Sequence, residues 1–310
     1  MALPLLAIVG PTASGKSQLA LFLAARLGGE IVNCDSLQIY RGFDIGTAKT
    51  IAPGVAHHLF DILDPTEDFT AGEYARRATA VVTEIAARRK TPVLVGGTGF
   101  YLRALLEGLA PAPERNQELR ERLDRRDGAR LHRLLSRLDP AVAGRIHPND
   151  KPKIIRALEV CLEARRPMSQ VWAEGRRGLA GFSVVKLGLN PPRTALYERI
   201  NQRTRLMYER GLLEEVRALL AAGVPPDAKP FQAPGYTEAL AVVRGTITLE
   251  HAVDLTQRRT RQYAKRQTTW FRREREMNWL MGFGEDPVIQ QAALEITKRG
   301  WPQINTDEHG

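Results

Sequence analysis

An eight-residue loop near the start of the chain matches the pattern G-x-x-x-x-G-K-[ST] at every defined position. It follows an apolar run at residues 5–9, which predicts a buried strand, and it opens residues 16–27, where leucines recur every four residues as in a helix. In that setting backbone amides and the helix N-terminus bind phosphate oxygens, and a serine hydroxyl can ligate Mg²⁺. The sequence therefore predicts a phosphate or diphosphate site formed by Gly10, Pro11, Thr12, Ala13, Ser14, Gly15, Lys16 and Ser17, with Lys16 as its cation and Ser17 as its metal ligand.

Further polar side chains follow two more candidate strands. Residues 30–33 lead to Asp35, and residues 92–97 lead to Thr98 between two glycines. Because ligands of a parallel sheet bind beyond the carboxyl ends of its strands, Asp35 and Thr98 should converge with the loop on one cleft. Asp35 suits a general base or a ligand of the metal shell, and its ordinary alternative is a helix N-cap or turn residue. Thr98 suits close approach of a ligand or a plain tight turn, and Gln38 can read a base edge or satisfy backbone groups.

The distal segment at residues 260–273 combines basic and aromatic side chains. Read as a helix, it places Arg261 and Lys265 on one side and Tyr263 and Trp270 on another. Basic residues that meet phosphates, interleaved with aromatic rings, are typical of nucleic-acid binding. The alternative is a solvated basic helix whose aromatic residues belong to the core. The excess of 45 Lys and Arg over 35 Asp and Glu, a net charge of +10, favours a polyanionic partner, unless the source simply favours arginine.

The alternation of strands and helices predicts an α/β fold, a P-loop NTPase-like parallel sheet flanked by helices. The candidate strands are residues 5–9, 30–33, 92–97 and 183–189. Between residues 114 and 181 the strand signals vanish and Arg/Glu-rich helical segments appear at 118–138 and 153–165. We therefore expect a catalytic core at 1–113 and 182–310 with an α-helical insertion domain at 114–181. Residues after 192 read as mostly helical, with a break at 223–234 and a loosely attached tail after Asp286.

Composition narrows the setting of the protein. Cys34 and Cys161 are far apart, which argues against a disulfide framework and against structural zinc, and His57 and His58 read as structural residues. The apolar start lacks a basic leader and a cleavage site, and no apolar run approaches membrane-spanning length. A reducing cytoplasm is therefore the expected location.

The motifs together resemble the tRNA dimethylallyltransferase family of the bacterial type. They follow one another in the family's order and cover most of the chain: GPTASGKS (10–17), DSLQIYRGFDIGTAK (35–49), HHLFDI (57–62), VGGTGFYLRALLEGL (95–109), RIHPND (145–150), RALEV (156–160), GLLEEV (211–216), GYTEAL (235–240) and TRQYAKRQTTWFR (260–272). A generic P-loop kinase would share only the first of them.

This resemblance implies a reaction and roles for several residues. A dimethylallyl group would move from dimethylallyl diphosphate to the N⁶ amine of the adenosine immediately 3′ of a tRNA anticodon, and diphosphate would leave. Asp35 matches the catalytic base, and Thr98 matches a threonine near the bond that breaks. Lys16, the loop amides and Mg²⁺ would stabilise the diphosphate, and Arg203 would reach it.

The resemblance also implies that the protein contacts the anticodon stem-loop of tRNA. It further implies a monomer that does not associate with a membrane. Lys153 stands where the family pattern carries an arginine, so it keeps the charge but loses the forked geometry. The residues implied to bind tRNA are Asp35, Ser36, Leu37, Gln38, Thr98, Arg120, Lys153, Arg156, Arg261 and Lys265.

Two rival functions share parts of the pattern. A small-molecule P-loop kinase that uses ATP would explain the loop and leave the basic aromatic helix unexplained. A noncatalytic RNA-binding module, or an RNA-stimulated nucleotide hydrolase, would explain the charge and give Asp35 and Thr98 no joint purpose.

Overall fold

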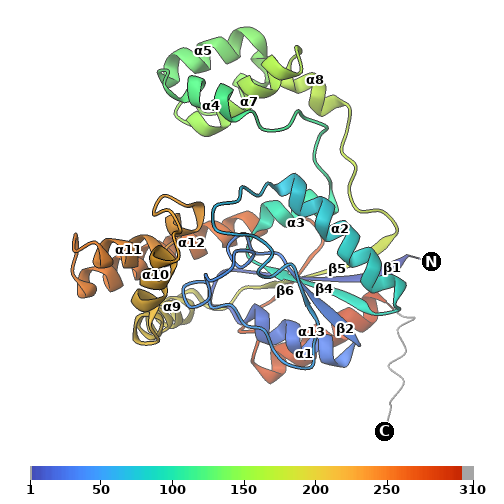
Figure 1. The fold of residues 1–310 in the computed structure, drawn as a ribbon. Coiled ribbons are helices and arrows are strands. Elements are labelled where there is room, and N and C mark those ends of the chain that lie inside the picture. The colour runs from blue at the N-terminus through green and yellow to red at the C-terminus, as the bar shows by residue number, and fades with distance from the viewer. Residues whose placement is uncertain (1, 302–310) are drawn as a thin grey trace. The chain divides into compact units, whose positions relative to one another are not determined.

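The structure is a computed structural model that describes residues 2–301, and its strands form one six-stranded sheet in which every neighbouring pair is parallel (Figure 1). The strand order is β3-β2-β4-β1-β5-β6, so β1 lies in the interior between β4 and β5. The strands are β1 (Leu3–Val9), β2 (Gly29–Asn33), β3 (His57–His58), β4 (Thr91–Gly96), β5 (Phe182–Leu189) and β6 (Met277–Leu280).

The interior strands are apolar because helices cover both faces of the sheet. Leu6 of β1 is fully buried, and it lies in register with Val93 of β4 and Val185 of β5. The loops after β1, β2 and β4 leave the sheet at the same edge, where ligands of such sheets bind. The α/β class predicted from the sequence is confirmed, as are its four predicted strands, which correspond to β1, β2, β4 and β5.

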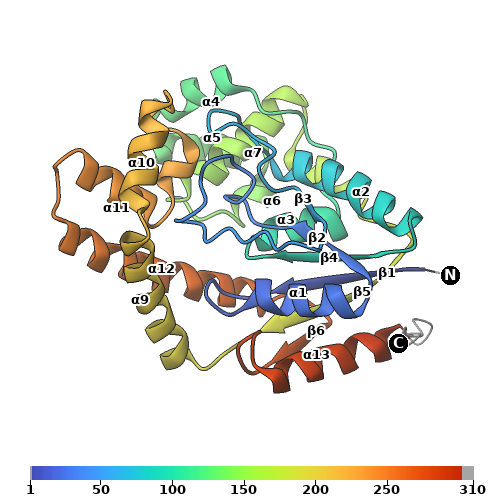
Figure 2. The same cartoon turned by 60° about the horizontal axis from the view of Figure 1, so that its bottom comes forward.

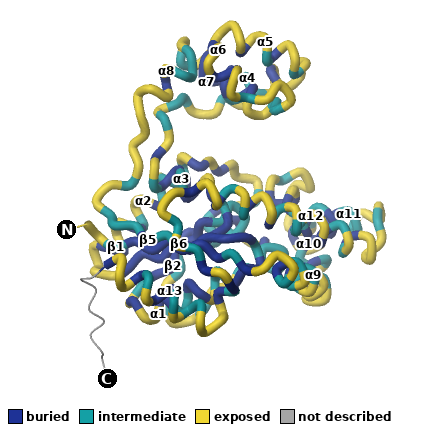
Figure 3. Tube along the Cα trace, turned by 180° about the vertical axis from the view of Figure 1, so that it is seen from behind, coloured by how far each residue is buried: buried dark blue, intermediate teal, exposed yellow. Residues whose placement is uncertain are grey.

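Helices α1 (Lys16–Arg26) and α13 (Pro287–Gly300) cover one face of the sheet, and α2 (Ala71–Ala87) covers the other, with α3 (Gly99–Leu106) beside it (Figures 1 and 2). Leu19 and Leu23 of α1 pack with Ile8 in the core on the first face. Figure 3 shows how the buried part of the trace follows the strands. The predicted helix at residues 16–27 is confirmed, and its four-residue leucine spacing marks the buried side.

A group of helices lies at the carboxyl end of the sheet (Figures 1 and 2). The longest of them, α12, has 23 residues and carries basic side chains along its length. No helix within residues 2–301 combines the length and the apolarity needed to cross a membrane. The group consists of α9 (Arg193–Glu209), α10 (Leu212–Ala221), the 3₁₀ turn η1 (Lys229–Gln232), α11 (Tyr236–Val243) and α12 (Leu249–Phe271).

Residues 106–179 form a second compact unit with its own hydrophobic core, whereas the other described residues, 2–105 and 180–301, belong to the first unit. The predicted helical stretch at 118–138 is two helices, because the side chain of Asp127 accepts the Arg130 N–H at 3.0 Å and starts a new one. The assignment of residues 114–181 as a tRNA-contacting domain stays a prediction. The helices of this unit are α4 (Gln117–Asp124), α5 (Gly128–Leu138), α6 (Pro140–Ala143), α7 (Lys151–Glu163) and α8 (Met168–Ala173).

The expectation of a loosely attached tail after Asp286 is wrong. Asp286 caps α13 by accepting the Val288 N–H at 2.9 Å, and Ala293 and Leu294 are buried in the core of the first unit. Trp301 is also buried there, and its indole N–H donates to the Ser183 carbonyl at 3.0 Å. The apolar residues of α13 are few and mixed with polar ones, so its buried face is recognised only from the packing in the structure. The remainder of the expected tail, residues 302–310, lies outside the described residues.

Two edge strands escaped the sequence prediction. β6 follows α12 and pairs with β5, so the chain after residue 192 is not only helical. β3 consists of His57 and His58 alone and pairs with β2. Edge strands this short have too few residues for an alternating pattern to be visible in the sequence.

Candidate active site

The P-loop wraps the start of α1 in the backbone geometry that its glycines allow. Gly15 has a φ of 86° and precedes α1 directly, and an added Cβ would collide with the Glu285 carboxylate. Gly10 has a φ of 150°, and an added Cβ would lie 2.8 Å from the Leu189 carbonyl oxygen. These positions therefore need glycine, and the loop packs directly against the segment that connects β6 to α13.

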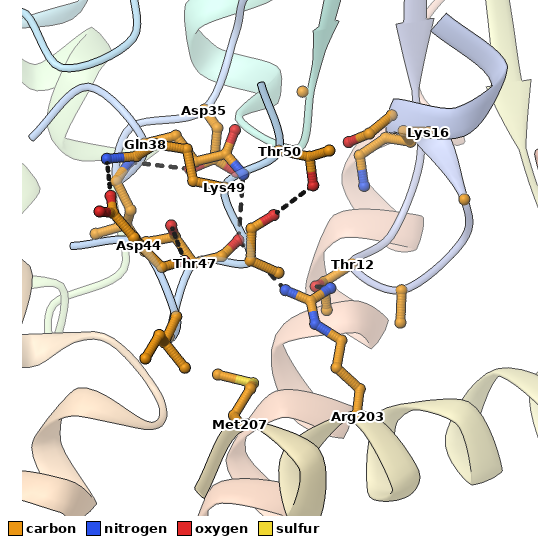
Figure 4. A pocket seen from close by; sticks show the side chains of 18 of the residues that line it. Thr12, Lys16, Asp35, Gln38, Asp44, Thr47, Lys49, Thr50, Arg203 and Met207 are labelled. Carbon is orange, nitrogen blue, oxygen red and sulfur yellow. Dashed lines mark hydrogen bonds and ion pairs between the residues drawn. The ribbon is translucent and has the colours of Figure 1, made fainter. Parts of the chain in front are cut away.

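A cavity of about 510 Å³ opens beside this loop in the first unit (Figure 4). The P-loop contributes Thr12, Ala13, Gly15, Lys16 and Ser17 to its lining. Asp35, Leu37 and Gln38 follow β2 into the same cavity, and Arg203 reaches it from α9. Three of the four residues predicted to be catalytic, Lys16, Asp35 and Arg203, therefore share one cavity. The other predicted loop members, Gly10, Pro11 and Ser14, are buried behind the lining.

Lys16 is held at the wall of this cavity. Its ammonium donates to the Pro11 carbonyl oxygen at 2.7 Å. Burial lowers the pKa of Lys16 from 10.5 to about 8, while the nearby Asp35 carboxylate opposes the shift and the Arg203 guanidinium adds to it. The cavity thus holds a cation that has no direct carboxylate partner within residues 2–301 and that gains from an incoming anion.

Arg203 has unused hydrogen-bonding capacity. It donates from Nη1 to the Thr12 hydroxyl and from Nη2 to the Thr47 carbonyl oxygen, each over a long 3.3 Å. Its buried Nε has no hydrogen-bond partner among the described residues. Burial lowers the pKa of Arg203, which Asp35 counteracts. A buried guanidinium with a free donor is suited to an anion with several oxygens.

Arg199 lies one helical turn before Arg203 and also lines the cavity, although sequence reasoning did not identify it. It pairs with Glu285 and stacks over the Phe283 ring at 4.8 Å. The signal was available as the i, i+4 spacing of two arginines on one predicted helix.

Asp35 and Thr98 lie close together through Ser36. The Thr98 hydroxyl accepts the Ser36 N–H at 3.0 Å and donates to the Ser36 hydroxyl at 3.3 Å. Asp35 uses one oxygen, Oδ1, to accept the Leu37 N–H at 2.9 Å, while Asn33 holds its backbone. The P-loop and Asp35 share the cavity as predicted, but Thr98 and Ser36 are not among the described residues that line it, so the predicted convergence of Thr98 on the same cleft is not seen.

Gln267 connects the P-loop to the turn before Thr98, and sequence reasoning missed it. Its Oε1 accepts the Thr12 N–H at 2.8 Å, and its Nε2 donates to the Gly97 carbonyl at 3.0 Å. An added Cβ at Gly97 would collide with this amide. A possible signal was the polar residue three positions after Ala264 and four before Phe271, which both lie on the buried side of α12.

The basic face of α12 carries an open groove of about 410 Å³. Arg261, predicted to bind tRNA, does not line this groove, and it donates to Asn201 Oδ1 at 2.5 Å. Of the two predicted aromatic residues, Tyr263 lines the cavity of the P-loop, and Trp270 packs over Gly99 with Arg103 stacked 4.8 Å above its ring. The groove is lined by Gln262, Lys265, Arg266, Thr269, Trp270 and Arg273.

In the second unit, the three predicted tRNA contacts each have an acidic partner. Arg156 contacts the fully buried Glu159 at 2.5 Å, and Arg120 lies 3.8 Å from the same carboxylate. Lys153 pairs with Asp150 at 2.5 Å. Arg120 and Arg156 thus compensate a buried charge, which sequence reasoning did not foresee, and their role toward tRNA stays a prediction.

Residues that could hold a divalent metal are few. Ser17 lines the cavity beside Lys16, but residues 2–301 contain no cluster of three or more His, Cys, Asp or Glu residues suited to a metal. Mg²⁺ commonly binds through one or two protein ligands together with substrate phosphates. The predicted ligand Ser17 fits that mode and does not fit a site built entirely from protein.

A P-loop at the carboxyl edge of a parallel sheet, faced by a carboxylate and an arginine in one cavity, defines the class: a P-loop α/β enzyme whose substrate carries phosphate groups. Within this class, the family model described as IPP transferase matches residues 38–274. The chain therefore belongs to the IPP transferase family. The P-loop and Asp35 lie before the matched residues.

Relatives that match almost the whole chain agree with this family. A protein of Solibacter usitatus (strain Ellin6076) named tRNA dimethylallyltransferase is 54% identical over 299 residues, which cover 94% of this chain and 97% of that protein. A protein of Koribacter versatilis (strain Ellin345) with the same name is 54% identical over 301 residues, covering 95% of this chain and 98% of that protein.

Solved structures extend the likeness to the fold. The tRNA isopentenylpyrophosphate transferase of Bacillus halodurans has a TM-score of 0.70 at 38% identity and covers 96% of this chain and 97% of its own. A eukaryotic dimethylallyltransferase acting on tRNA has a TM-score of 0.77 at 28% identity over 87% of this chain and 70% of its own. The family and the enzyme class predicted from the sequence are confirmed, and prenyl transfer is favoured over the small-molecule kinase.

Proposed function

We propose that this chain transfers the dimethylallyl group of dimethylallyl diphosphate to the N⁶ amine of the adenosine immediately 3′ of a tRNA anticodon. The observation that carries this proposal is the meeting of Asp35, Lys16 and Arg203 in one cavity beside the P-loop. A carboxylate serves the nucleophile, and two cations serve the leaving group. A phosphoryl-transfer enzyme can also pair cations with an aspartate base, so the preference for prenyl transfer comes from the family match.

Asp35 acts on the amine. The lone pair of an adenine amine is delocalised into the ring, so a carboxylate that orients the amine and accepts its proton lowers the barrier. The nitrogen forms a bond to the allylic carbon while the bond from that carbon to the diphosphate oxygen breaks. The electron pair of the broken bond leaves with the diphosphate, and the proton of the amine goes to Asp35.

Lys16, Arg203 and the loop amides bind the diphosphate. Negative charge grows on the leaving oxygen as the bond breaks, and donors placed there beforehand stabilise that charge. Two observations support this role: Nε of Arg203 has no hydrogen-bond partner in the described part of the chain, and the ammonium of Lys16 is desolvated. The family resemblance assigns Thr98 to the bond that breaks; in this structure its hydroxyl binds Ser36 and does not line the cavity among the described residues.

Ser17 would hold Mg²⁺ together with the diphosphate oxygens. When bound, the ion neutralises charge on the leaving group. This assignment is limited to the one hydroxyl that lines the cavity at the start of α1.

The tRNA must present an extruded base, because the amine is otherwise sequestered in the stack. Residues 35–38 and Thr98 grip that base, and the groove on α12 binds the phosphate backbone. The second unit, through Arg120, Lys153 and Arg156, contacts the anticodon arm. We propose that the protein carries out this reaction in the cytoplasm and as a monomer.

Removal of one positive charge from the groove should weaken tRNA binding and flatten its salt dependence. Lys265→Ala should reduce the slope of log K against log salt by about one, because each phosphate contact releases roughly one counterion. Arg261→Ala should have a smaller effect, since Arg261 is held by Asn201 and does not line the groove. Filter binding of tRNA across a series of salt concentrations measures both slopes. An unchanged slope in Lys265→Ala would reduce α12 to a scaffold.

The proposed reaction has a direct assay. The protein is incubated with Mg²⁺, labelled dimethylallyl diphosphate and unmodified tRNA, and the label on RNA is counted. Transfer of label without ATP supports the proposal. Robust ATP turnover without label transfer would instead support the kinase, and RNA binding without either activity would support the noncatalytic module.

A further inference from the structure

A short loop beside the cavity is held by two side chains from distant helices. The N–H groups of Asp44 and Ile45 both donate to Glu215 Oε2, at 3.1 and 2.8 Å. The next N–H along the chain, that of Gly46, donates to the Tyr236 hydroxyl at 3.1 Å. Three successive backbone donors therefore have side-chain acceptors from α10 and α11.

Glu215 and Tyr236 also bind each other. The Tyr236 hydroxyl donates to Glu215 Oε1 at 2.5 Å, so both oxygens of the carboxylate are used. The Tyr236 ring is buried and packs edge-on against Phe43 with the ring centroids 4.8 Å apart. Burial and the Glu215 carboxylate raise the pKa of Tyr236 far above its usual range, which keeps the hydroxyl a donor.

The carbonyl that follows this loop is shared by two residues of the site. The Thr47 carbonyl oxygen accepts Nε2 of Gln38 at 3.1 Å and Nη2 of Arg203 at 3.3 Å (Figure 4). Gln38 belongs to the proposed adenosine site, and Arg203 belongs to the proposed diphosphate site. A displacement of Thr47 would thus move both halves of the site.

We propose that Glu215 and Tyr236 are positioning residues for prenyl transfer, which set the Thr47 carbonyl and through it the relative placement of Gln38 and Arg203. This inference rests on the proposed function. It also gives a use to two motifs, residues 211–216 and 235–240, whose residues lie outside the cavity lining among the described residues. The ring of Tyr236 packs in the core, whereas its hydroxyl is used to hold the Gly46 N–H and Glu215.

The test removes single polar groups and retains shape. Tyr236→Phe keeps the buried ring and deletes the hydroxyl, and Glu215→Gln weakens the acceptor. Matched controls are Tyr208→Phe, which loses a bond to the Thr256 hydroxyl, and Glu214→Gln, which loses a surface pair with Arg217. We expect kcat/KM to fall roughly tenfold to a hundredfold in the first two variants, because small misplacements of reacting groups have effects of that size. The controls should stay within about twofold, as expected for groups whose removal leaves the site in place.

A double variant separates positioning from scaffolding. If Tyr236 acts through Thr47 on Gln38 as well as on Arg203, the loss in the double variant Tyr236→Phe/Gln38→Ala will be smaller than the product of the two single losses. Losses that multiply, or wild-type kinetics in folded Tyr236→Phe and Glu215→Gln, would overturn the inference.

Binding of inorganic diphosphate gives a readout that does not depend on transfer. Calorimetry should show weaker binding in Tyr236→Phe than in Tyr208→Phe, because Arg203 loses its fixed orientation. Equal affinities would also overturn the inference. If the two variants differ in diphosphate affinity as expected but the wild-type protein transfers no label to tRNA, the proposed function would be refuted instead.

Discussion

Replacing Asp35 with alanine is expected to reduce turnover by a factor of about 100 or more while leaving tRNA binding largely intact. The carboxylate accepts the proton of a weakly nucleophilic amine. Among the described residues that line the cavity, Asp44 is the only other one with a carboxylate. Single-turnover prenyl transfer and equilibrium tRNA binding, measured on the same preparation, separate the two effects.

Asp35→Asn provides the matched control. Asparagine retains an oxygen that can accept the Leu37 N–H, which Asp35 binds at 2.9 Å, and it removes only the basicity. A loss in Asp35→Asn as large as that in Asp35→Ala assigns the effect to proton transfer. If the rate and the tRNA affinity fell together, or if Asp35→Asn kept its rate, Asp35 would be a positioning residue.

The sequence was sufficient for the central sheet and for the residues that follow its strands. β1, β2 and β4 are apolar runs that end beside glycine or polar residues, and a parallel sheet must bring those ends together. Lys16 and Asp35 could therefore be placed in one cleft before any coordinates were known. The edge strands β3 and β6 and the packed helix α13 could not be placed, because their short patterns gain meaning only from the neighbours they pair with or cover.

Residues whose partners are distant in the chain were out of reach for the same reason. Gln267 meets Thr12, which lies 255 positions away, and Glu215 meets Ile45 across 170 positions. The helical pattern predicts which side of α12 is buried, but it does not predict which backbone N–H groups the side chains of that side will bind. Likewise, nothing in the sequence around Arg156 showed that the buried carboxylate of Glu159 would occupy its guanidinium.

Removal of the Lys16 ammonium is expected to reduce the rate of transfer by roughly 100- to 1,000-fold, as the loss of one preorganised donor to a developing negative charge commonly does. Lys16→Met keeps much of the length of the side chain and deletes the charge. The affinity for diphosphate should fall as well, since in the proposed site the Lys16 ammonium already contacts the diphosphate before the bond breaks. Rates at saturating dimethylallyl diphosphate isolate the part that belongs to the transition state. A variant that regains the wild-type rate at saturation would limit Lys16 to substrate binding.

The lowered pKa of Lys16 predicts how diphosphate binding depends on pH. In the free protein the ammonium has a pKa of about 8, so its charge is present below pH 8 and is lost as the pH rises through that value. An anion binds the charged form and must restore the proton above pH 8, and affinity should then fall by up to about tenfold per pH unit. Calorimetry with inorganic diphosphate from pH 6.5 to 9.5 measures this fall. Lys16→Arg, whose guanidinium stays charged, corrects for the ionisation of diphosphate itself. If both proteins showed the same pH profile, Lys16 would not be the titrating group.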